Sequence, residues 1–159
     1  MRQSVFDFLD ELHIQYEKLE HPPILTMEEG KEVKRQLNAT SCKNLFLCNK
    51  QKEYFLLMYP ENKKLDSKSI SRQIGSSHLS FARQEDMQCL LHTTPGAASV
   101  LGLIFDMENR VRLLIGHEIA ETEYIACHPC INTCSLKIRM TDLSTVFLPA
   151  VKHDYTIIK

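Results

Sequence analysis

Three short segments of the sequence carry residue types that could do chemistry. Lys43 begins an apolar run, and no Asp or Glu occurs within four residues of it. Residues 95–99 (PGAAS) form a turn of small residues, whose backbone N–H groups could donate hydrogen bonds to an oxyanion or a phosphate. His128 is followed by Pro129, a pair typical of turns. Taken singly, each feature has an ordinary explanation as a surface lysine, a tight turn and a turn histidine.

The strand predicted around Lys43 raises the question of which group balances the positive charge of this lysine. Side chains alternate along an extended chain, so Lys43 shares a face with Leu45 and Leu47. A buried ammonium group must be solvated or paired. If this face is buried, the partner of Lys43 must therefore come from outside its own strand.

A cluster of cysteines suggests zinc as an alternative. Cys127 and Cys130 have Cys-x2-Cys spacing, with Cys134 and His128 close by. A structural zinc site usually needs two well-spaced ligand pairs, and the remaining candidate, His117, has no partner cysteine. Free cysteine also commonly fills core positions. A zinc-binding module stays open as a hypothesis, but the sequence favours no metal and no other cofactor.

The commonest catalytic motifs are absent from the sequence. It contains no G-x-S-x-G elbow, no Walker loop, no G-x-G-x-x-G and no H-E-x-x-H. No motif therefore supports covalent catalysis by serine or cysteine. The absence of the other motifs argues against the commonest classes of nucleotide-binding protein and metalloprotease.

Composition predicts one soluble globular domain over residues 1–159. Apolar residues make up 43% of the chain, charged residues 25%, and the formal net charge is −1. A near-neutral chain lacks the basic field needed for wrapping by nucleic acid, so any RNA contact should be a local patch. The N-terminus lacks a signal-peptide core, and no apolar run is long enough for a spanning helix. We therefore expect a cytoplasmic protein with reduced cysteines and no membrane association.

Hydrophobic periodicity and turn signals predict the elements that position these residues. Helices are expected at 4–13, 27–37 and 83–91, and after Thr141. A further helix, capped by Asp66 or Ser67, carries Ile70 and Ile74 and is stopped by Gly75. Strands are expected at 15–19, 44–48, 54–59, 111–115, 123–126, 134–138 and 155–158. The small-residue segment 93–106 is expected to be an irregular loop that leads into apolar chain.

Two of these strands predict the fold class. The segments 44–48 and 54–59 are joined by five polar residues, a length that suits a β-hairpin. The second segment, YFLLMY, is apolar at every position, as expected of a strand covered on both faces. An antiparallel hairpin among several helices predicts an α/β fold with a mixed, largely antiparallel β-sheet packed with helices.

Taken in order, these pieces resemble the YbaK/ProX family, which is related to the editing insertion domain of bacterial-type prolyl-tRNA synthetases. The resemblance is carried by KNLFL at 43–47, LDSK at 65–68, LSFA at 79–82, PGAASVLGL at 95–103, FD at 105–106 and HPCINT at 128–133. Each segment is short, but their order and spacing extend over most of the chain. The resemblance implies the family's mixed α/β sandwich.

The resemblance also implies an activity. It points to a freestanding hydrolase that removes a wrong amino acid from tRNA for proline, and family members with a similar loop act on alanine attached to that tRNA. An aminoacyl ester is already activated, so a site can work by orienting water and stabilising charge. A pocket closed by residues 96–99 could admit alanine and exclude the larger proline. The implied partners are the acceptor end of the mischarged tRNA and prolyl-tRNA synthetase.

The residue roles implied by the resemblance fall into two groups. Lys43, Gly96 and His128 would be catalytic: Lys43 would meet the phosphate or ester end of the acceptor strand, and the terminal ribose hydroxyl would assist the attacking water. The amides of Gly96 and Ala97 would hold the carbonyl, while His128 and Asn132 would shape the pocket wall or orient the terminal adenosine. The substrate-binding residues would be Ala97, Ala98, Ser99, Val100, Asp106, Asn132 and Thr133, with bracing of the loop as the other role open to Asp106.

One position departs from the family pattern. The family loop usually runs Gly-x-x-x-Pro, and Val100 stands where the proline would be. Proline fixes its own φ and biases the residue before it, so its loss could loosen the loop and alter the pocket. The amino acid removed could therefore be cysteine or serine in place of alanine. A non-catalytic module that binds aminoacyl-tRNA or an amino acid is a second hypothesis.

Overall fold

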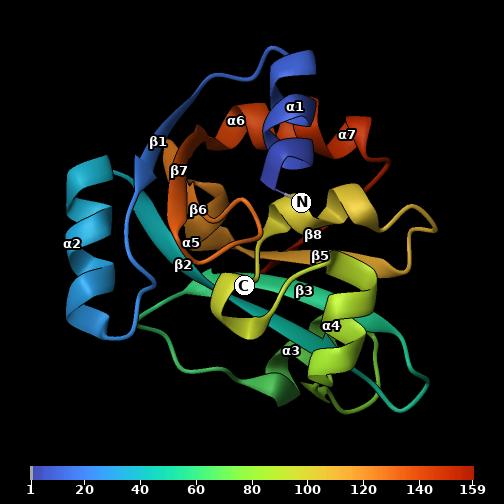
Figure 1. Ribbon diagram of the computed structural model, residues 1–159. Helices are drawn as coiled ribbons and strands as arrows, with labels where there is room; N and C mark the ends of the chain where they lie inside the picture. Colours follow the sequence, from blue (N-terminus) through green and yellow to red (C-terminus); the bar gives the residue numbers. More distant parts are fainter. Residues whose placement is uncertain (1) are drawn as a thin grey trace.

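A mixed β-sheet organises the computed structural model (Figure 1), which describes residues 2–159 except the side chains of Arg2, Gln3 and Met27. The strands are β1 (Tyr16–Glu20), β2 (Thr40–Cys48), β3 (Tyr54–Pro60), β4 (Ser80–Phe81), β5 (Val111–Gly116), β6 (Tyr124–Cys127), β7 (Cys134–Arg139) and β8 (Tyr155–Ile158). They follow the order β1-β7-β6-β2-β3-β5-β8, and β4 pairs with β2. The predicted α/β class with a mixed sheet is confirmed.

The strand β2 connects the two halves of this sheet. Thr40 and Ser41 pair in parallel with β6, whereas residues 42–48 pair antiparallel with β3. Figure 1 shows β2 as a long strand that crosses from the β6 side to the β3 side. The predicted hairpin is confirmed, although β2 begins at Thr40 and not at residue 44, because backbone pairing with β6 extends the strand into its polar start.

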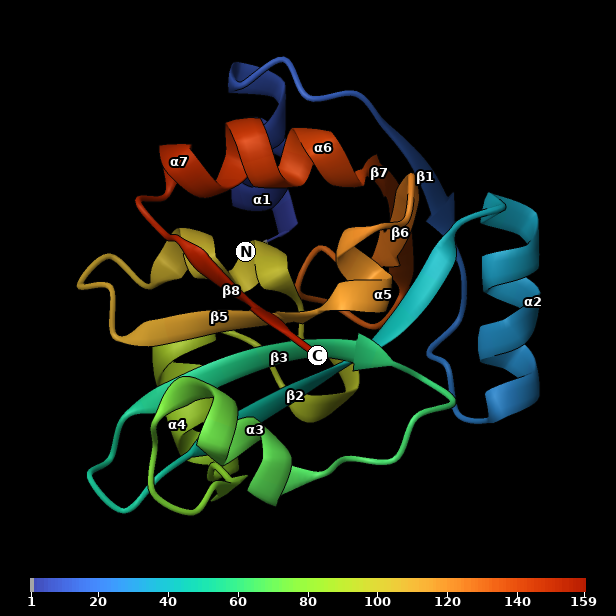
Figure 2. The same ribbon diagram turned by 180° about the vertical axis from the view of Figure 1, so that it is seen from behind.

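Helices cover both faces of the sheet. They are α1 (Arg2–Glu11), α2 (Met27–Leu37), α3 (Ser67–Ile74), α4 (Gln84–Leu91), α5 (His117–Ala120), and a C-terminal segment of α6 (Met140–Asp142), the π-helical turn η3 (Leu143–Phe147) and α7 (Leu148–Ala150). Figure 2 shows α6 and α7 beside α1 at one end of the molecule, and α3 and α4 at the other. Within residues 2–159, no helix has the length and apolar character needed to cross a bilayer.

The strand β3 is buried on both faces, as its apolar sequence predicts. Leu56 and Met58 point into the larger core, which also contains side chains from α1, α4 and the C-terminal helices. Leu57 and Tyr59 point into a smaller core closed by Ile70 of α3. The sheet therefore separates two hydrophobic cores, and β3 contributes side chains to each of them.

The segment 93–106 is more regular than the sequence suggested. It forms two 3-10 helices, η1 (Pro95–Ala97) and η2 (Val100–Phe105), in place of an irregular loop. Ser99 caps η2, because its hydroxyl accepts a hydrogen bond from the N–H of Leu101 at 3.1 Å. The hydroxyl of Thr93 donates to the carbonyl of Ala97 at 2.8 Å and closes η1. These side-chain bonds hold both turns in place.

The close approach of η2 to α4 gives a first test of the fold. A Cβ atom at Gly102 would lie 2.9 Å from the carbonyl oxygen of Leu91, so alanine there would force η2 away from α4. We expect Gly102→Ala to lower the free energy of unfolding by about 1–3 kcal/mol, measured by urea denaturation. Gly30→Ala is the control, because its Cβ would meet Ile24 at an ordinary 3.6 Å. Equal losses in the two variants would contradict the tight packing at Gly102.

Candidate functional site

A cavity of about 310 Å³ lies where β2 passes between the two halves of the sheet. Its lining includes Lys43 of β2, Gly96 and Ala98 at η1, and His128 in the loop before β7. In Figure 1, η1 and this loop both lie in front of β2. The fold thus brings together the three segments that the sequence singled out. The volume falls in the range of small-molecule sites, about 300–1,000 Å³.

Several predicted substrate-binding residues do not line the cavity. Ser99 and Val100 are fully buried, with Ser99 capping η2 and Val100 packing in the larger core. The amide nitrogen of Asn132 would lie 3.8 Å from a Cβ at Gly96, so Asn132 is close to η1. The carbonyl of Thr133 accepts the backbone N–H of His21 at 3.0 Å.

The free backbone N–H groups of η1 are not the two that the sequence predicted. The N–H of Ala97 donates to the carbonyl of Thr94 at 2.9 Å, so it is already used inside the turn. The N–H groups of Gly96 and Ala98 have no hydrogen-bond acceptor among residues 2–159. Both residues line the cavity. The amide pair available to a carbonyl oxygen is therefore Gly96 and Ala98, and not Gly96 and Ala97.

Asp106 lies away from the cavity lining, in a buried network. Its carboxylate accepts the backbone N–H groups of Arg110 and Val111 at 3.0 and 2.8 Å. Nε2 of His153 lies 2.9 Å from the same carboxylate, and both side chains are 1% exposed. Asp106 thus braces the connection between η2 and β5, which corrects its placement among the substrate-binding residues.

Lys43 is partly buried and has an aromatic neighbour. Its ammonium nitrogen lies 5.9 Å from the centre of the Tyr59 ring, directly across the β2–β3 pair. Lys63 lies 5.3 Å from the centre of the same ring. Among the side chains that the structure describes, no carboxylate forms an ion pair with Lys43. Its positive charge at the cavity is therefore free to meet an anionic ligand.

A second cation in the lining was missed by the sequence reasoning. Lys34 of α2 lines the cavity and forms an ion pair with Glu61, which follows β3. Burial lowers the pKa of Lys34, the neighbouring Cys42 opposes this, and repulsion from Lys31 lowers it further. The helix dipole favours a lysine in the last turn of any helix. The presence of Lys34 at this position therefore did not indicate that it lines a cavity.

His128 is held by a backbone contact that fixes its proton. Its Nδ1 lies 2.8 Å from the carbonyl oxygen of Cys134, which can only accept, so Nδ1 carries the hydrogen. Burial lowers the pKa of His128, the hydrogen bond to Cys134 opposes this, and the nearby ring of His21 lowers it further. At neutral pH the ring is therefore uncharged, with a lone pair on Nε2.

The cysteines near the cavity are buried thiols. Burial raises the pKa of Cys42 and of Cys130 to about 12 each, and it raises the pKa of Cys127 as well. Protonated thiols are poor nucleophiles and poor metal ligands. Over the described part of the chain, no group of three His, Cys, Asp or Glu side chains is arranged to hold a metal ion.

Comparison with known proteins places the chain in a family. Residues 21–146 match the family model described as an aminoacyl-tRNA editing domain. The Prolyl-tRNA editing protein ProX of Acetoanaerobium sticklandii is 32% identical over 146 residues, which cover 91% of this chain and 89% of that protein. Prolyl-tRNA synthetase associated domain-containing protein 1 of Danio rerio is 29% identical over 160 residues, which cover 99% of this chain and 86% of that protein.

Solved structures share the fold. A crystal structure described as a candidate trans-editing enzyme for prolyl tRNA synthetase matches with a TM-score of 0.72 at 14% identity, over 99% of this chain and 96% of that chain. The crystal structure of a hypothetical protein matches with a TM-score of 0.75 at 14% identity, over 97% of each chain. The family model, the identity to ProX and the common fold confirm the resemblance seen in the sequence: this chain belongs to the aminoacyl-tRNA editing domain family.

Proposed function

We propose that this protein is a trans-editing hydrolase that removes alanine from mischarged tRNA for proline. The observation that carries the proposal is the cavity of about 310 Å³, in which Lys43, the Gly96 turn and His128 meet from three distant parts of the chain. The name of the ProX relative supports prolyl-tRNA editing as the process.

The groups in the lining suit hydrolysis of an activated ester. Lys43 meets the anionic end of the acceptor strand, since no carboxylate of the described residues neutralises it. The ester carbonyl is the acceptor that we assign to the free N–H groups of Gly96 and Ala98. These groups stabilise the oxyanion as the tetrahedral intermediate forms. The terminal ribose hydroxyl of the substrate assists the attacking water. The scheme needs no covalent nucleophile, because the ester is already activated.

The composition of the wall supports a small amino acid as the substrate. Gly96, Ala98, Ala126, Cys42 and Cys127 contribute small side chains or none. Such a wall lets a methyl side chain lie close to the backbone, while the larger Ile24, Val33 and Pro95 of the same lining would meet the bulkier, rigid proline ring. The cavity would therefore select its substrate by size, as other editing sites do when they hydrolyse only the amino acids small enough to enter.

A panel of tRNAs for proline charged with alanine, serine, cysteine or proline tests this function. We expect catalytic amounts of the protein to release alanine fastest and to leave the prolyl-tRNA intact, measured as loss of labelled amino acid over time. Faster release of serine or cysteine would assign a different substrate. Binding without release of any amino acid would instead show a non-catalytic module.

We also propose an association with prolyl-tRNA synthetase, which would deliver mischarged tRNA to the editing site. The names of the relatives above, which refer to prolyl-tRNA editing or to that synthetase, support this partner. Co-elution of the two proteins in gel filtration, with and without tRNA for proline, tests it. Independent elution under both conditions would contradict it.

A further inference from the structure

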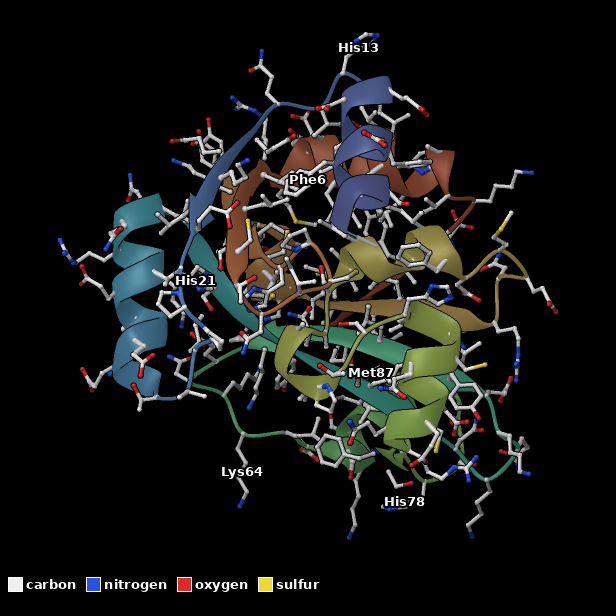
Figure 3. All side chains as sticks on the ribbon, viewed as in Figure 1. Phe6, His13, His21, Lys64, His78 and Met87 are labelled. Atoms are coloured by element: carbon white, nitrogen blue, oxygen red, sulfur yellow. The ribbon has the colours of Figure 1, made fainter. Side chains whose placement is uncertain are left out.

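His21 lies just outside the cavity lining but is tied to it by hydrogen bonds. Its Nε2 lies 2.8 Å from the hydroxyl oxygen of Ser135, and Ser135 lines the cavity. The same hydroxyl oxygen lies 3.5 Å from Nδ1 of His128, and the two imidazole rings are 6.1 Å apart. Figure 3 shows His21 between α2 and the sheet. A chain of polar groups therefore leads from His21 to the cavity.

The acceptors at the two ends of this chain determine the direction of its hydrogen bonds. Nδ1 of His21 lies 2.8 Å from the carbonyl oxygen of Pro22, so this nitrogen carries the hydrogen. Nε2 of the neutral ring is then an acceptor, and Ser135 must donate its hydroxyl hydrogen to it. The oxygen of Ser135 is left to accept the longer contact from Nδ1–H of His128. Every donor in the chain then has an acceptor.

We propose that His21 is a positioning residue of the editing site: it accepts the Ser135 hydrogen and so keeps this hydroxyl from donating to Nδ1 of His128. The Nδ1–H form set by the Cys134 carbonyl is thereby kept, and Nε2 can accept a hydrogen bond from the substrate. This inference rests on the function proposed above. In the part of the chain that the structure describes, Nε2 of His128 has no hydrogen-bond partner. The ligand group that matches it is an N–H or O–H donor beside the ester. An aminoacyl-tRNA end offers two, the α-ammonium group and the free ribose hydroxyl.

The charges around His128 favour this acceptor role. The groups that face the cavity with it are the cations Lys34 and Lys43, Glu61 paired with Lys34, and the protonated thiols of Cys42 and Cys127, with His21 behind Ser135. Burial lowers the pKa of His128, the hydrogen bond to Cys134 opposes this, and the neighbouring His21 lowers it further. Activity should therefore rise as the pH increases through the pKa of His128, and it should level off once the ring is neutral.

Variants of the full-length protein test the role of His21. We expect His21→Phe to lower kcat/KM for alanyl-tRNA by about 10-fold or more, because a histidine in the wrong tautomer loses much of its catalytic value. Its loss also removes the contribution of His21 that lowers the pKa of His128, so the acid limb of the pH profile should move to higher pH. His21→Gln should recover part of the rate, since an amide oxygen can accept from Ser135. His78→Phe, at an exposed position far from His21 in Figure 3, is the matched control.

The tautomer itself provides a readout that does not depend on turnover. In ¹⁵N NMR spectra of the imidazole rings, we expect the hydrogen of His128 on Nδ1 in the wild type, and a population with hydrogen on Nε2 in His21→Phe. A wild-type rate and pH profile in folded His21→Phe would overturn the proposal, as would an Nε2–H tautomer in the wild type. If no tRNA is deacylated, the proposed function fails, while the spectra still decide the role of His21.

Two further experiments separate the remaining alternatives. Affinities for non-hydrolysable amide analogues of alanyl-adenosine would show which donor binds His128. A propionyl analogue lacks the α-ammonium group, and a deoxyribose analogue lacks the ribose hydroxyl. If one of these groups is the donor, His21→Phe should no longer lower the affinity for the analogue that lacks it. A loss that persists with both analogues would overturn the assignment. So would a trapped acyl group on Ser135, because it would make Ser135 a nucleophile activated by His21.

Discussion

Replacing Lys43 with alanine is expected to lower kcat/KM for release of alanine from mischarged tRNA by about 100-fold or more. Lys43 lines the cavity, and no carboxylate of the described side chains neutralises its ammonium group. The missing counter-charge would come from the bound tRNA end, whose negative charge increases as the oxyanion forms. Single-turnover deacylation with labelled alanine measures the loss.

The control for this variant lies beyond the other end of the same strand. Lys50 is exposed in the β2–β3 turn, and Lys50→Ala should keep the wild-type rate. The melting temperature should stay near the wild-type value in both variants, because Lys43 makes no ion pair with the described residues that its removal would break. A wild-type rate for folded Lys43→Ala would refute the assigned role of this lysine.

Replacing Asp106 with alanine should have the largest effect on stability. The substitution leaves His153 and the N–H group of Val111 buried without their acceptor, and the N–H group of Arg110 also loses its acceptor. Breaking a buried pair in this way costs about 3–5 kcal/mol in the free energy of unfolding. Urea denaturation followed by circular dichroism measures the change.

Asp154 provides a matched control for Asp106. It is an exposed carboxylate next to His153 in the sequence, so Asp154→Ala should change the free energy of unfolding by no more than about 0.5 kcal/mol. If Asp106→Ala kept the wild-type stability but lost deacylation, Asp106 would act on substrate after all, and its assignment as a brace would be wrong.

The sequence predicted most of the fold because its signals are local. The hairpin of β2 and β3 follows from two apolar runs and a polar turn, and the buried β3 follows from its composition. The strand β4 has only two residues and α5 only four, which is too short for a periodic pattern to appear. The 3-10 turns of residues 95–105 depend on hydroxyl caps whose partners only the folded chain brings together.

The sequence singled out candidate site residues only where they belong to short motifs. Lys43, Gly96 and His128 are such residues, and the fold places them around one cavity, while their roles stay predictions. The role of Asp106 could not be seen, because its partner His153 lies far along the sequence. Ser135 carried no signal, because side-chain alternation places it on the same face as Lys137, and only the structure shows that it is buried.

The course of β2 limits how the length of this chain can change. Because side chains alternate, a slip of one residue would exchange the faces of Lys43 and its neighbours. The parallel pairs at Thr40 and Ser41 and the antiparallel pairs of residues 42–48 fix the same strand from two sides. Insertions in the turn at 49–53 would therefore leave the cavity intact. One extra residue between Ser41 and Lys43 would instead break one of the two pairings or turn the lysine away, so relatives that keep the activity should vary in length at the turn and not there.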